Sequence, residues 1–545
     1  MASTGGPVAL ASQAQRQPRT YTPSPWGEFF LHHTPCTPSQ LLAMKQKAQI
    51  KEEEVRHIIL VTAASSDLAR KMELVDTLQR IGVDYHYKKE IDELLCSVYH
   101  NKDTGSEDLY ITSLRFYLLR KHGHTLSSDV FAKFRDEQGN ISSDDVSCLL
   151  MLYDAAHLRT HGEEILDNVI TFNKTSLQSM MKNLDPELAE EVRCTLETPR
   201  FRRVKRVEAR RYISVYEKKA TRDEAILEFA KLDYNILQAI YCDELKELTI
   251  WWKDFRVGTD MNFTRDRMVE LHFWMMAVVS EPYYSYSRKM LTKFVVYATM
   301  FDDLYDNYSS TEESDIFTTA LERWDEQATE EFPAHLKTLL LNILSSTNKM
   351  EEDLKVQKNK HAELVKEVVI HTAKSYHAEV TWRDEHYVPA SVEEHLQISN
   401  PSSVCMQITN LALISLGDVT TREDVDWAFT FPKIVRGTCI VGRIGNDIMS
   451  HEREQASEHV VSTVQTCMKQ YGVAVEEANE KLRIMIEEAW MDIVEECLDQ
   501  KRPMPLLEVV VDLARTMDFM YKRDDAFTMS FSLKDVIAAM YVNSV

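Results

Sequence analysis

The chain has 545 residues, 44% hydrophobic and 27% charged, which is the composition of a folded protein with enough length for roughly two to four domains. Its 86 acidic and 63 basic residues give a formal net charge of -23, which argues against a nucleic-acid partner because such binding needs Lys and Arg to neutralise phosphates. The sequence contains no apolar run long enough to predict a transmembrane helix, and its nine cysteines form no C-x-x-C pair, which indicates reduced, buried thiols.

Residues 1–40 are interrupted by several prolines and are predicted to form an irregular arm, with Arg16, Arg19 and Trp26 as its distinctive side chains. From there to residue 222, apolar residues recur at three-to-four spacing, beginning with 40–64 and 67–81, and short turns separate the segments. This pattern predicts amphipathic helices packed antiparallel in a bundle or helical barrel. We find no candidate catalytic cluster in residues 41–222.

The basic stretch at residues 200–211 is where a nucleic-acid site could be sought. The interleaved Glu208 and the following Tyr212 favour a solvated helix face instead. The polar residues 217–223 then form the best candidate domain boundary.

The second half is also helical in pattern, with segments that include 223–236, 238–254, 266–279, 285–308, 432–454 and 504–520. Period-2 alternation flanked by hairpin turns does not occur. We therefore predict an all-α fold with a 1–40 arm, an N-terminal helical domain at 41–222 and a C-terminal domain at 223–545.

Three carboxylates follow an apolar run at residues 294–301: Asp302, Asp303 and Asp306. Neither Gly nor Pro interrupts this region, so one helix can continue through it, and Asp302 and Asp306 then share a face at i, i+4. Two like charges about 4 Å apart repel by roughly 4 kcal/mol at an intermediate dielectric. If buried, the pair is protonated or holds a cation such as Mg²⁺; the alternative is a helix that reaches the surface here, with its acids in water.

A second group of oxygen donors, Asn446, Ser450 and Glu454, steps by four along a predicted helix and lines one stripe. An amide, a hydroxyl and a carboxylate are ligands that Mg²⁺ accepts. Arg443 lies one turn upstream, near the same face. The spacing alone is common, so a metal site here depends on its neighbours in the fold.

Two arginines, Arg265 and Arg267, open a helix that contains Trp274, and their forked donors suit phosphate oxygens. The alternatives are an exposed charged helix start and a tryptophan in the core. Trp274 would have a chemical role if its ring faced a carbocation. Residues 521–527 form a charged loop whose simplest interpretation is a surface turn.

Taken together and in chain order, these motifs resemble those of the plant class I terpene synthases, over nearly the whole chain. Each motif is modest alone, and the ordered set is specific. The matches to the D-D-x-x-D, N/D-D-x-x-S/T-x-x-x-E and R-x-R motifs and to the aromatic of the following helix are Asp302, Asp303 and Asp306; Asn446, Asp447, Ser450 and Glu454; Arg265 and Arg267; and Trp274.

The resemblance implies a C-terminal domain that binds three Mg²⁺ ions, which Mn²⁺ can replace. Asp302 and Asp306 would hold two of the ions, and Asn446, Ser450 and Glu454 the third. The N-terminal domain would have no catalytic role, and the arm would cap the active site.

In the same family role, the ions and the arginines Arg265, Arg267 and Arg443 would clamp a prenyl diphosphate and draw the diphosphate away. An apolar pocket would then steer the allyl cation. The remaining residues implied to contact the substrate or line the pocket are Asp302, Asp306, Asn446, Trp274, Tyr521, Asp525 and Phe527.

The sequence departs from the family pattern in three places. The paired arginines of the family's arm are replaced by the separated Arg16 and Arg19, the late loop reads Asp525-Ala526-Phe527 where Asp-Gly-Tyr is common, and the helix at 409–418 has altered polarity. These departures affect the product more than ionisation. Arg16 lies so near Met1 that little room is left for a plastid transit peptide, so we expect a cytoplasmic, monomeric sesquiterpene synthase acting on farnesyl diphosphate.

Two alternatives remain at this stage. A prenyl chain-elongating synthase also ionises allylic diphosphates, but it would be expected to carry a second D-D-x-x-D. The chain could instead be a non-catalytic helical interaction protein that retains the fold, against which the complete set of metal-ligand residues argues.

Overall fold

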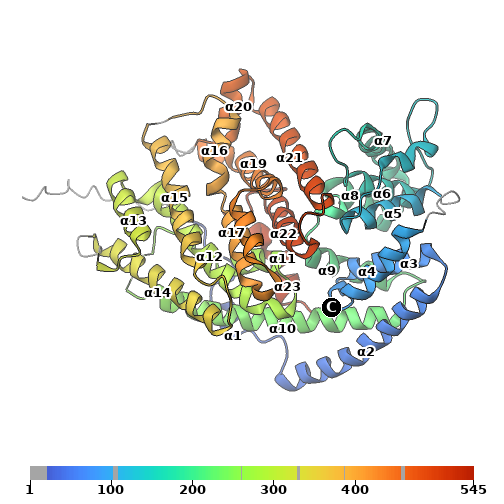
Figure 1. Cartoon of the computed structure of the whole chain (residues 1–545), viewed down its shortest axis with the longest axis horizontal. Helices are drawn as coiled ribbons and strands as arrows, with labels where there is room; N and C mark the ends of the chain where they lie inside the picture. The colour runs from blue at the N-terminus through green and yellow to red at the C-terminus, as the bar shows by residue number, and fades with distance from the viewer. Residues whose placement is uncertain (1–20, 102–107, 259–260, 328–331, 386, 456–460) are drawn as a thin grey trace, which may run out of the picture.

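The computed structural model describes residues 21–101, 108–258, 261–327, 332–385, 387–455 and 461–545, and every regular element in these ranges is a helix (Figure 1). The predicted all-α class is confirmed. The first helices are α1 (Phe29–His32), α2 (Pro38–Ala64), α3 (Leu68–Ile81), α4 (Lys88–His100), α5 (Leu109–Lys121), α6 (Val146–Ala156), α7 (Glu164–Met180), α8 (Pro186–Glu197) and α9 (Lys205–Glu217).

The remaining helices form the second half and share one continuous apolar core with the first. They are α10 (Glu224–Phe255), α11 (Met268–Val278), α12 (Ser285–Asp303), α13 (Thr311–Arg323), α14 (Ala334–Val356), α15 (Leu364–Glu385), α16 (Val392–Ser402), α17 (Cys405–Ser415), α18 (Arg422–Phe429), α19 (Lys433–Gln455), α20 (Thr463–Tyr471), α21 (Val475–Leu498), α22 (Met504–Met520) and α23 (Lys534–Tyr541).

Local sequence signals set several helix ends. The Thr37 side chain caps α2 in a reciprocal pair with Gln40, and the Asp67 carboxylate accepts a hydrogen bond from the Arg70 N–H at the start of α3. Gly82 ends α3 with φ 81°, a left-handed conformation that favours glycine. These ends agree with the sequence prediction to within a few residues.

Helix α10 corrects the prediction of separate helices at 223–236 and 238–254. It is one continuous helix of 32 residues, capped by the Asp223 side chain. The chain contains no Gly or Pro between 224 and 255, and Leu237, at the expected break, is 1% exposed. Helix α10 runs beside α2 along one edge of the molecule (Figure 1) and also packs against α11 and α12. Because it contacts both halves, the division at residue 223 stays a prediction.

The basic stretch 200–211 corrects a second expectation, because it is not a solvated helix face. Arg202 and Arg206 are 3% and 4% exposed. Both terminal guanidinium nitrogens of Arg202 donate to Glu487 of α21, at 2.5 and 2.7 Å, and Lys205 pairs with Glu508 of α22 at 2.6 Å. The stretch therefore joins α9 and the segment before it to the second half of the molecule.

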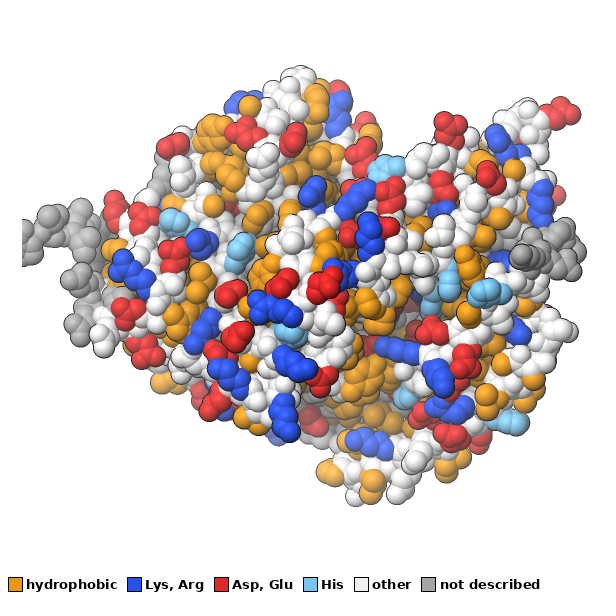
Figure 2. All heavy atoms as spheres, viewed as in Figure 1, with side chains coloured by type: hydrophobic (Ala, Val, Ile, Leu, Met, Phe, Trp, Pro, Cys, Tyr) orange, Lys and Arg blue, Asp and Glu red, His pale blue; other side chains and the backbone are white. Residues whose placement is uncertain are grey.

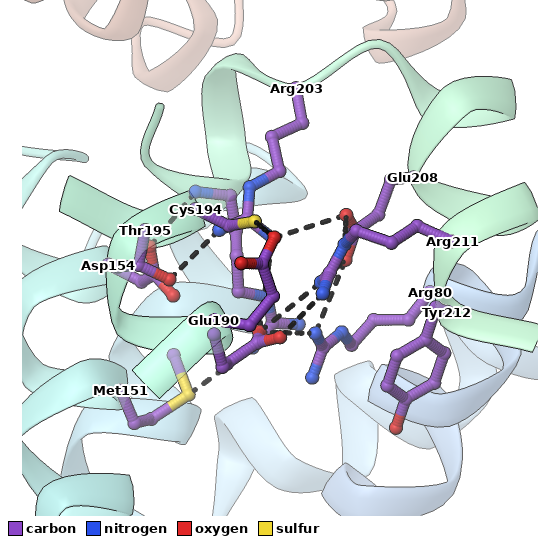
Figure 3. Close-up of polar contacts among 12 residues, drawn as sticks. Arg80, Met151, Asp154, Glu190, Cys194, Thr195, Arg203, Glu208, Arg211 and Tyr212 are labelled. Atoms are coloured by element: carbon purple, nitrogen blue, oxygen red, sulfur yellow. Dashed lines mark hydrogen bonds and ion pairs between the residues drawn. The ribbon is translucent and has the colours of Figure 1, made fainter. Parts of the chain in front are cut away.

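The same stretch also pairs with acids of its own half (Figure 3). Glu208 accepts hydrogen bonds from Arg203 at 3.1 Å, from Arg211 at 2.9 Å and from Arg80 of α3 at 3.2 Å. Burial alone would raise the pKa of Glu208, but these three guanidiniums lower it to well below its usual range. The arginines here neutralise buried carboxylates.

On the face shown in Figure 2, acidic and basic side chains are interspersed. All nine cysteines are free thiols, as the sequence predicts, and six of them are buried, but Cys36 and Cys194 are partly exposed and Cys96 is exposed, so the expectation that all are buried is wrong at these three. Among the described helices, none combines the length and the hydrophobicity needed to cross a bilayer.

Candidate active site

A cavity of about 160 Å³ lies among α11, α12, α15, α16, α17, α19 and α22. Its lining gathers most of the residues singled out from the sequence, although they are up to 262 positions apart. The predicted residues on its wall are Arg265, Trp274, Asp302, Asp306, Arg443, Asn446, Asp447, Glu454, Tyr521, Asp525 and Phe527. Three more, Arg267, Asp303 and Ser450, are buried outside the lining.

The first acidic motif lies where α12 changes to a π-helical turn at Leu304–Tyr308. The Ser309 N–H bonds the Leu304 carbonyl five residues back, at 2.8 Å, and the Arg383 guanidinium of α15 donates to the carbonyls of Tyr305 and Ser309. A π turn widens a helix and is frequent at functional sites. The predicted helix at 285–308 is therefore continuous but not α-helical throughout, and Asp302 and Asp306 both line the cavity.

Arg265 connects this motif to the loop before α11. Its guanidinium pairs with Asp302 and, at 3.0 Å, with Asp303. Burial lowers the pKa of Arg265, but Asp303 and Asp302 raise it by more, so the net shift is upward. Asp303 itself is 1% exposed, which makes it an internal anchor and leaves Asp302 as its neighbour on the wall.

The second group of donors lies on α19. Asn446 and Glu454 line the cavity, and the fully buried Ser450 occupies the helical turn between them. Arg443 donates to the Ser399 carbonyl at 3.2 Å and to the Ser402 hydroxyl at 3.1 Å, which fixes its guanidinium at the wall.

The cavity carries more acid than its bases neutralise. Burial first, and then repulsion from Asp302 and Glu379, raise the pKa of Asp306 well above its usual range. Burial and the nearby Asp447 raise the pKa of Glu454 to about 7. Carboxylate and amide oxygens crowded in this way fit a hard divalent cation, whose charge would relieve the repulsion.

Arg267 does not face the cavity, although the sequence placed it in the diphosphate clamp. It is 2% exposed, and its guanidinium donates to four backbone carbonyls: Phe527 at 3.0 Å, Thr528 at 3.0 Å, Thr22 at 2.8 Å and the adjacent Asp266 at 3.1 Å. It therefore joins the end of the arm to the late loop.

The late loop closes one side of the cavity and is not a plain surface turn. The Asp525 carboxylate accepts from Arg453 of α19 at 2.5 Å and from the Thr528 N–H at 3.1 Å. The Trp274 ring centroid lies 5.5 Å from that of Phe527 and 6.5 Å from that of Tyr521. These three rings form an aromatic part of the wall.

Helix α15 also contributes to the cavity wall, which no sequence motif predicted. Tyr376 and Glu379, one turn apart, line the cavity, and Glu379 accepts a hydrogen bond from the Ser402 hydroxyl. Burial raises the pKa of Glu379, while Arg443, 3.9 Å away, opposes the rise. A single carboxylate on a largely apolar helix face was the available signal. Arg16 and Arg19 of the arm lie outside the described residues, and Trp26 packs on Phe30 at 5.5 Å between ring centroids.

Two family models match the chain. The one described as "Terpene synthase, N-terminal domain" covers residues 25–196, and the one described as "Terpene synthase family, metal binding domain" covers residues 253–492. The (E)-beta-caryophyllene synthase of Zea mays is 54% identical to this chain over 95% of each sequence. The zingiberene synthase of Sorghum bicolor is 43% identical over 96% of this chain and 97% of its own length.

Solved structures give the same result. A limonene synthase with 2-fluorolinalyl diphosphate superposes with a TM-score of 0.89 at 28% identity, covering 96% of this chain and 99% of its own. Isoprene synthase from grey poplar (Populus x canescens), in complex with three Mg²⁺ ions and dimethylallyl-S-thiolodiphosphate, gives 0.84 at 28% identity, covering 92% and 97%. With family models and full-length relatives in agreement, the chain belongs to the terpene synthase family.

Proposed function

We propose that this protein is a Mg²⁺-dependent sesquiterpene synthase, which ionises farnesyl diphosphate and converts the resulting cation to a C15 product with release of diphosphate. Full-length relatives that are similar in sequence support the chain length of the substrate. They are named as synthases of caryophyllene, farnesene and zingiberene, and all three products are C15 hydrocarbons.

The observation that carries the proposal is the convergence of two sets of oxygen donors on one cavity. Asp302 and Asp306 approach from α12 and its π turn, and Asn446 and Glu454 from α19. We assign two Mg²⁺ ions to the aspartates and a third to Asn446, Ser450 and Glu454, with Mn²⁺ as a substitute. The three ions in the isoprene synthase complex support this number.

The residues of the chain would act on the two ends of the substrate differently. Arg265 and Arg443 stay charged in the buried site and offer forked donors to the diphosphate oxygens. When bound, the metal ions supply further positive charge where the leaving group becomes negative. This electrostatic preorganisation would stabilise the transition state for cleavage of the carbon–oxygen bond more than it stabilises the bound substrate.

The hydrocarbon end would face the aromatic wall. The ring faces of Trp274, Tyr521 and Phe527 can stabilise a carbocation by roughly 0.5–2 kcal/mol each. Closure of the late loop over this wall would keep water from the cation. Product identity depends on small differences among the competing fates of the cation.

The donor set also bears on the alternatives. Asn446, Ser450 and Glu454 stand where a chain-elongating synthase would be expected to have a second run of aspartates, and the retained donors disfavour a non-catalytic role. We also propose that the protein is a monomer located in the cytoplasm. Light scattering during gel filtration and fractionation of the source tissue would test these two points.

The test of function is incubation of the purified protein with Mg²⁺ and, separately, geranyl, farnesyl and geranylgeranyl diphosphate. Volatile products are then identified by gas chromatography and mass spectrometry. A C15 hydrocarbon or alcohol formed from farnesyl diphosphate is the expected result. Longer prenyl diphosphates formed when isopentenyl diphosphate is added would support chain elongation instead, and no turnover of any substrate would support the non-catalytic alternative.

A further inference from the structure

The end of the arm makes three polar contacts with residues that flank the cavity. The Tyr21 hydroxyl donates to Asp303 at 2.8 Å, the Thr22 carbonyl accepts from Arg267 at 2.8 Å, and the Ser24 hydroxyl donates to Glu270 at 2.7 Å. Only the first of these contacts reaches the acidic motif. The arm is therefore bonded to the carboxylate that stands next to Asp302.

Asp303 is the meeting point of three separate segments. One of its oxygens accepts from the Thr264 hydroxyl at 3.0 Å and from the Arg265 backbone N–H at 2.8 Å. The other accepts from Tyr21 and lies 3.0 Å from the Arg265 guanidinium. A single buried carboxylate thus holds the arm, the loop before α11 and the end of α12 together.

The Tyr21 ring contributes a second contact. It lies 5.4 Å from the Arg265 guanidinium carbon, and the Phe527 ring lies 4.8 Å from the same atom. Two aromatic rings, one from the arm and one from the late loop, therefore pack near one guanidinium that also pairs with Asp302. Burial and the nearby Asp303 charge raise the pKa of Tyr21, so its hydroxyl remains a donor.

We propose that Tyr21 is a positioning residue for diphosphate ionisation: its hydrogen bond to Asp303 couples docking of the arm to the placement of Arg265 and Asp302 at the cavity. Loss of the hydroxyl leaves Asp303 with fewer donors and frees the end of α12 to shift. A shift of the reacting groups by even 1 Å costs catalytic rate steeply. The change in rate is expected only when the arm is docked at the cavity, and the proposal rests on the proposed function.

The test compares Tyr21→Phe with Ser24→Ala in the full-length protein. Tyr21→Phe keeps the ring beside Arg265 and removes only the donor to Asp303. Ser24→Ala removes an equally short hydrogen bond from the same part of the arm, but its partner Glu270 is fully buried and away from the cavity wall. For each variant, kcat, KM, the Mg²⁺ concentration at half-maximal rate and the apparent Tm are measured with farnesyl diphosphate.

We expect Tyr21→Phe to lower kcat about tenfold, the order that loss of one hydrogen bond to a charged group produces, and to raise the half-saturating Mg²⁺ concentration about threefold or more. Ser24→Ala should match it in Tm but leave the Mg²⁺ dependence within about twofold of wild type, since its bond does not reach the acidic motif. The difference in Mg²⁺ dependence between the two variants separates a positioning role of Tyr21 from a general loosening of the arm.

Equal kcat and Mg²⁺ dependence in wild type and Tyr21→Phe would overturn the proposal, and so would identical changes in the two variants. A wild-type protein that releases no diphosphate from any prenyl substrate would instead overturn the proposed function. The two failures are distinguished by the wild-type measurement alone.

Discussion

Among single residues, Glu454 shows how burial near another acid in the cavity changes the pKa of a carboxyl group. Its side chain is 16% exposed on α19, and burial together with Asp447 raises its pKa from 4.5 to about 7. The folded, metal-free protein therefore keeps a proton that the unfolded chain would release. A bound divalent cation must displace that proton.

The first prediction follows from this shift. Because the pKa is higher in the folded protein, the free energy of unfolding without metal should fall as pH rises from about 4.5 to 7 and then level off. The loss from this group is at most about 3 kcal/mol. Glu454→Gln should remove this part of the slope. Urea unfolding in EDTA at several pH values measures it, with the exposed Glu452→Gln as a control.

If the unfolding free energies of wild type and Glu454→Gln depend on pH in the same way, the pKa of Glu454 is not raised in the folded protein. The cavity would then not favour the protonated form of this carboxyl.

Residue identities and their spacing predicted most of the charged side chains on the cavity wall, but not which members of a motif face the cavity. Asp302 and Asp303 are adjacent in the chain, yet one lines the cavity and the other is an internal anchor. The partners that decide this, Tyr21 and Thr264, lie 282 and 39 positions away from Asp303. Arg267 lies outside the lining for the same reason, since three of its four backbone acceptors belong to the arm and the late loop.

At the scale of elements, the depth at which α19 packs decides where its donors lie. A Cβ added to Gly437 would lie 2.9 Å from the Ala489 carbonyl oxygen and 3.1 Å from an Ile493 side-chain carbon, both on α21. Helix α19 can therefore approach α21 closely only because this residue lacks a side chain.

The second prediction tests that packing. Gly437→Ala should destabilise the protein by about 1–3 kcal/mol, although Ala favours a helix over Gly by about 1 kcal/mol. The matched control is Gly445→Ala on the same helix, whose added Cβ would make only an ordinary 3.4 Å contact with Tyr521. Chemical unfolding of both variants measures the difference. Equal stability of the two would contradict the packing argument.

Periodicity located most helices but not their interruptions. The helix through the acidic motif was expected to be regular, but it contains a π turn that is bonded by Arg383 of α15. Because Arg383 lies on a different helix, no local sequence pattern could predict this contact. Helix α10 was predicted as two segments that meet at residue 237, whereas its buried face is continuous across Leu237. In both cases contacts from other helices decide the local structure.

At the scale of the whole molecule, arginines of the basic stretch join the two halves. Arg202 is nearly fully buried and holds Glu487 with two hydrogen bonds, while the Glu487 side chain is 40% exposed. Removing one partner of a buried pair is costly, but solvent at Glu487 reduces the effect.

The third prediction is that Arg202→Gln lowers the free energy of unfolding by about 2 kcal/mol or more while kcat stays within about twofold of wild type. Arg222→Gln is the control, because its pair with Glu224 is solvent-exposed and should contribute less than about 1 kcal/mol. Calorimetry and turnover assays measure the two effects. If Arg202→Gln leaves the free energy of unfolding unchanged, the basic stretch does not hold the two halves together.

The fold class and the family were accessible from the sequence because ordered motifs and helical periodicity extend over most of the chain. The role of the basic stretch could not be predicted from the sequence, because a run of arginines looks the same whether or not acidic partners lie on α21. Charge on a helix predicts exposure only where no complementary surface covers it.

The cavity between α12 and α19 is proposed to ionise a prenyl diphosphate with the help of divalent cations. The most direct measurement is the rate of diphosphate release from farnesyl diphosphate as Mg²⁺ is titrated, for wild type, Asp302→Asn and the exposed control Glu312→Gln. We predict Mg²⁺-dependent release that EDTA abolishes, a loss of about 100-fold or more in Asp302→Asn, and near wild-type rates in the control. Release that persists in EDTA, or that is unchanged in Asp302→Asn, would contradict the account.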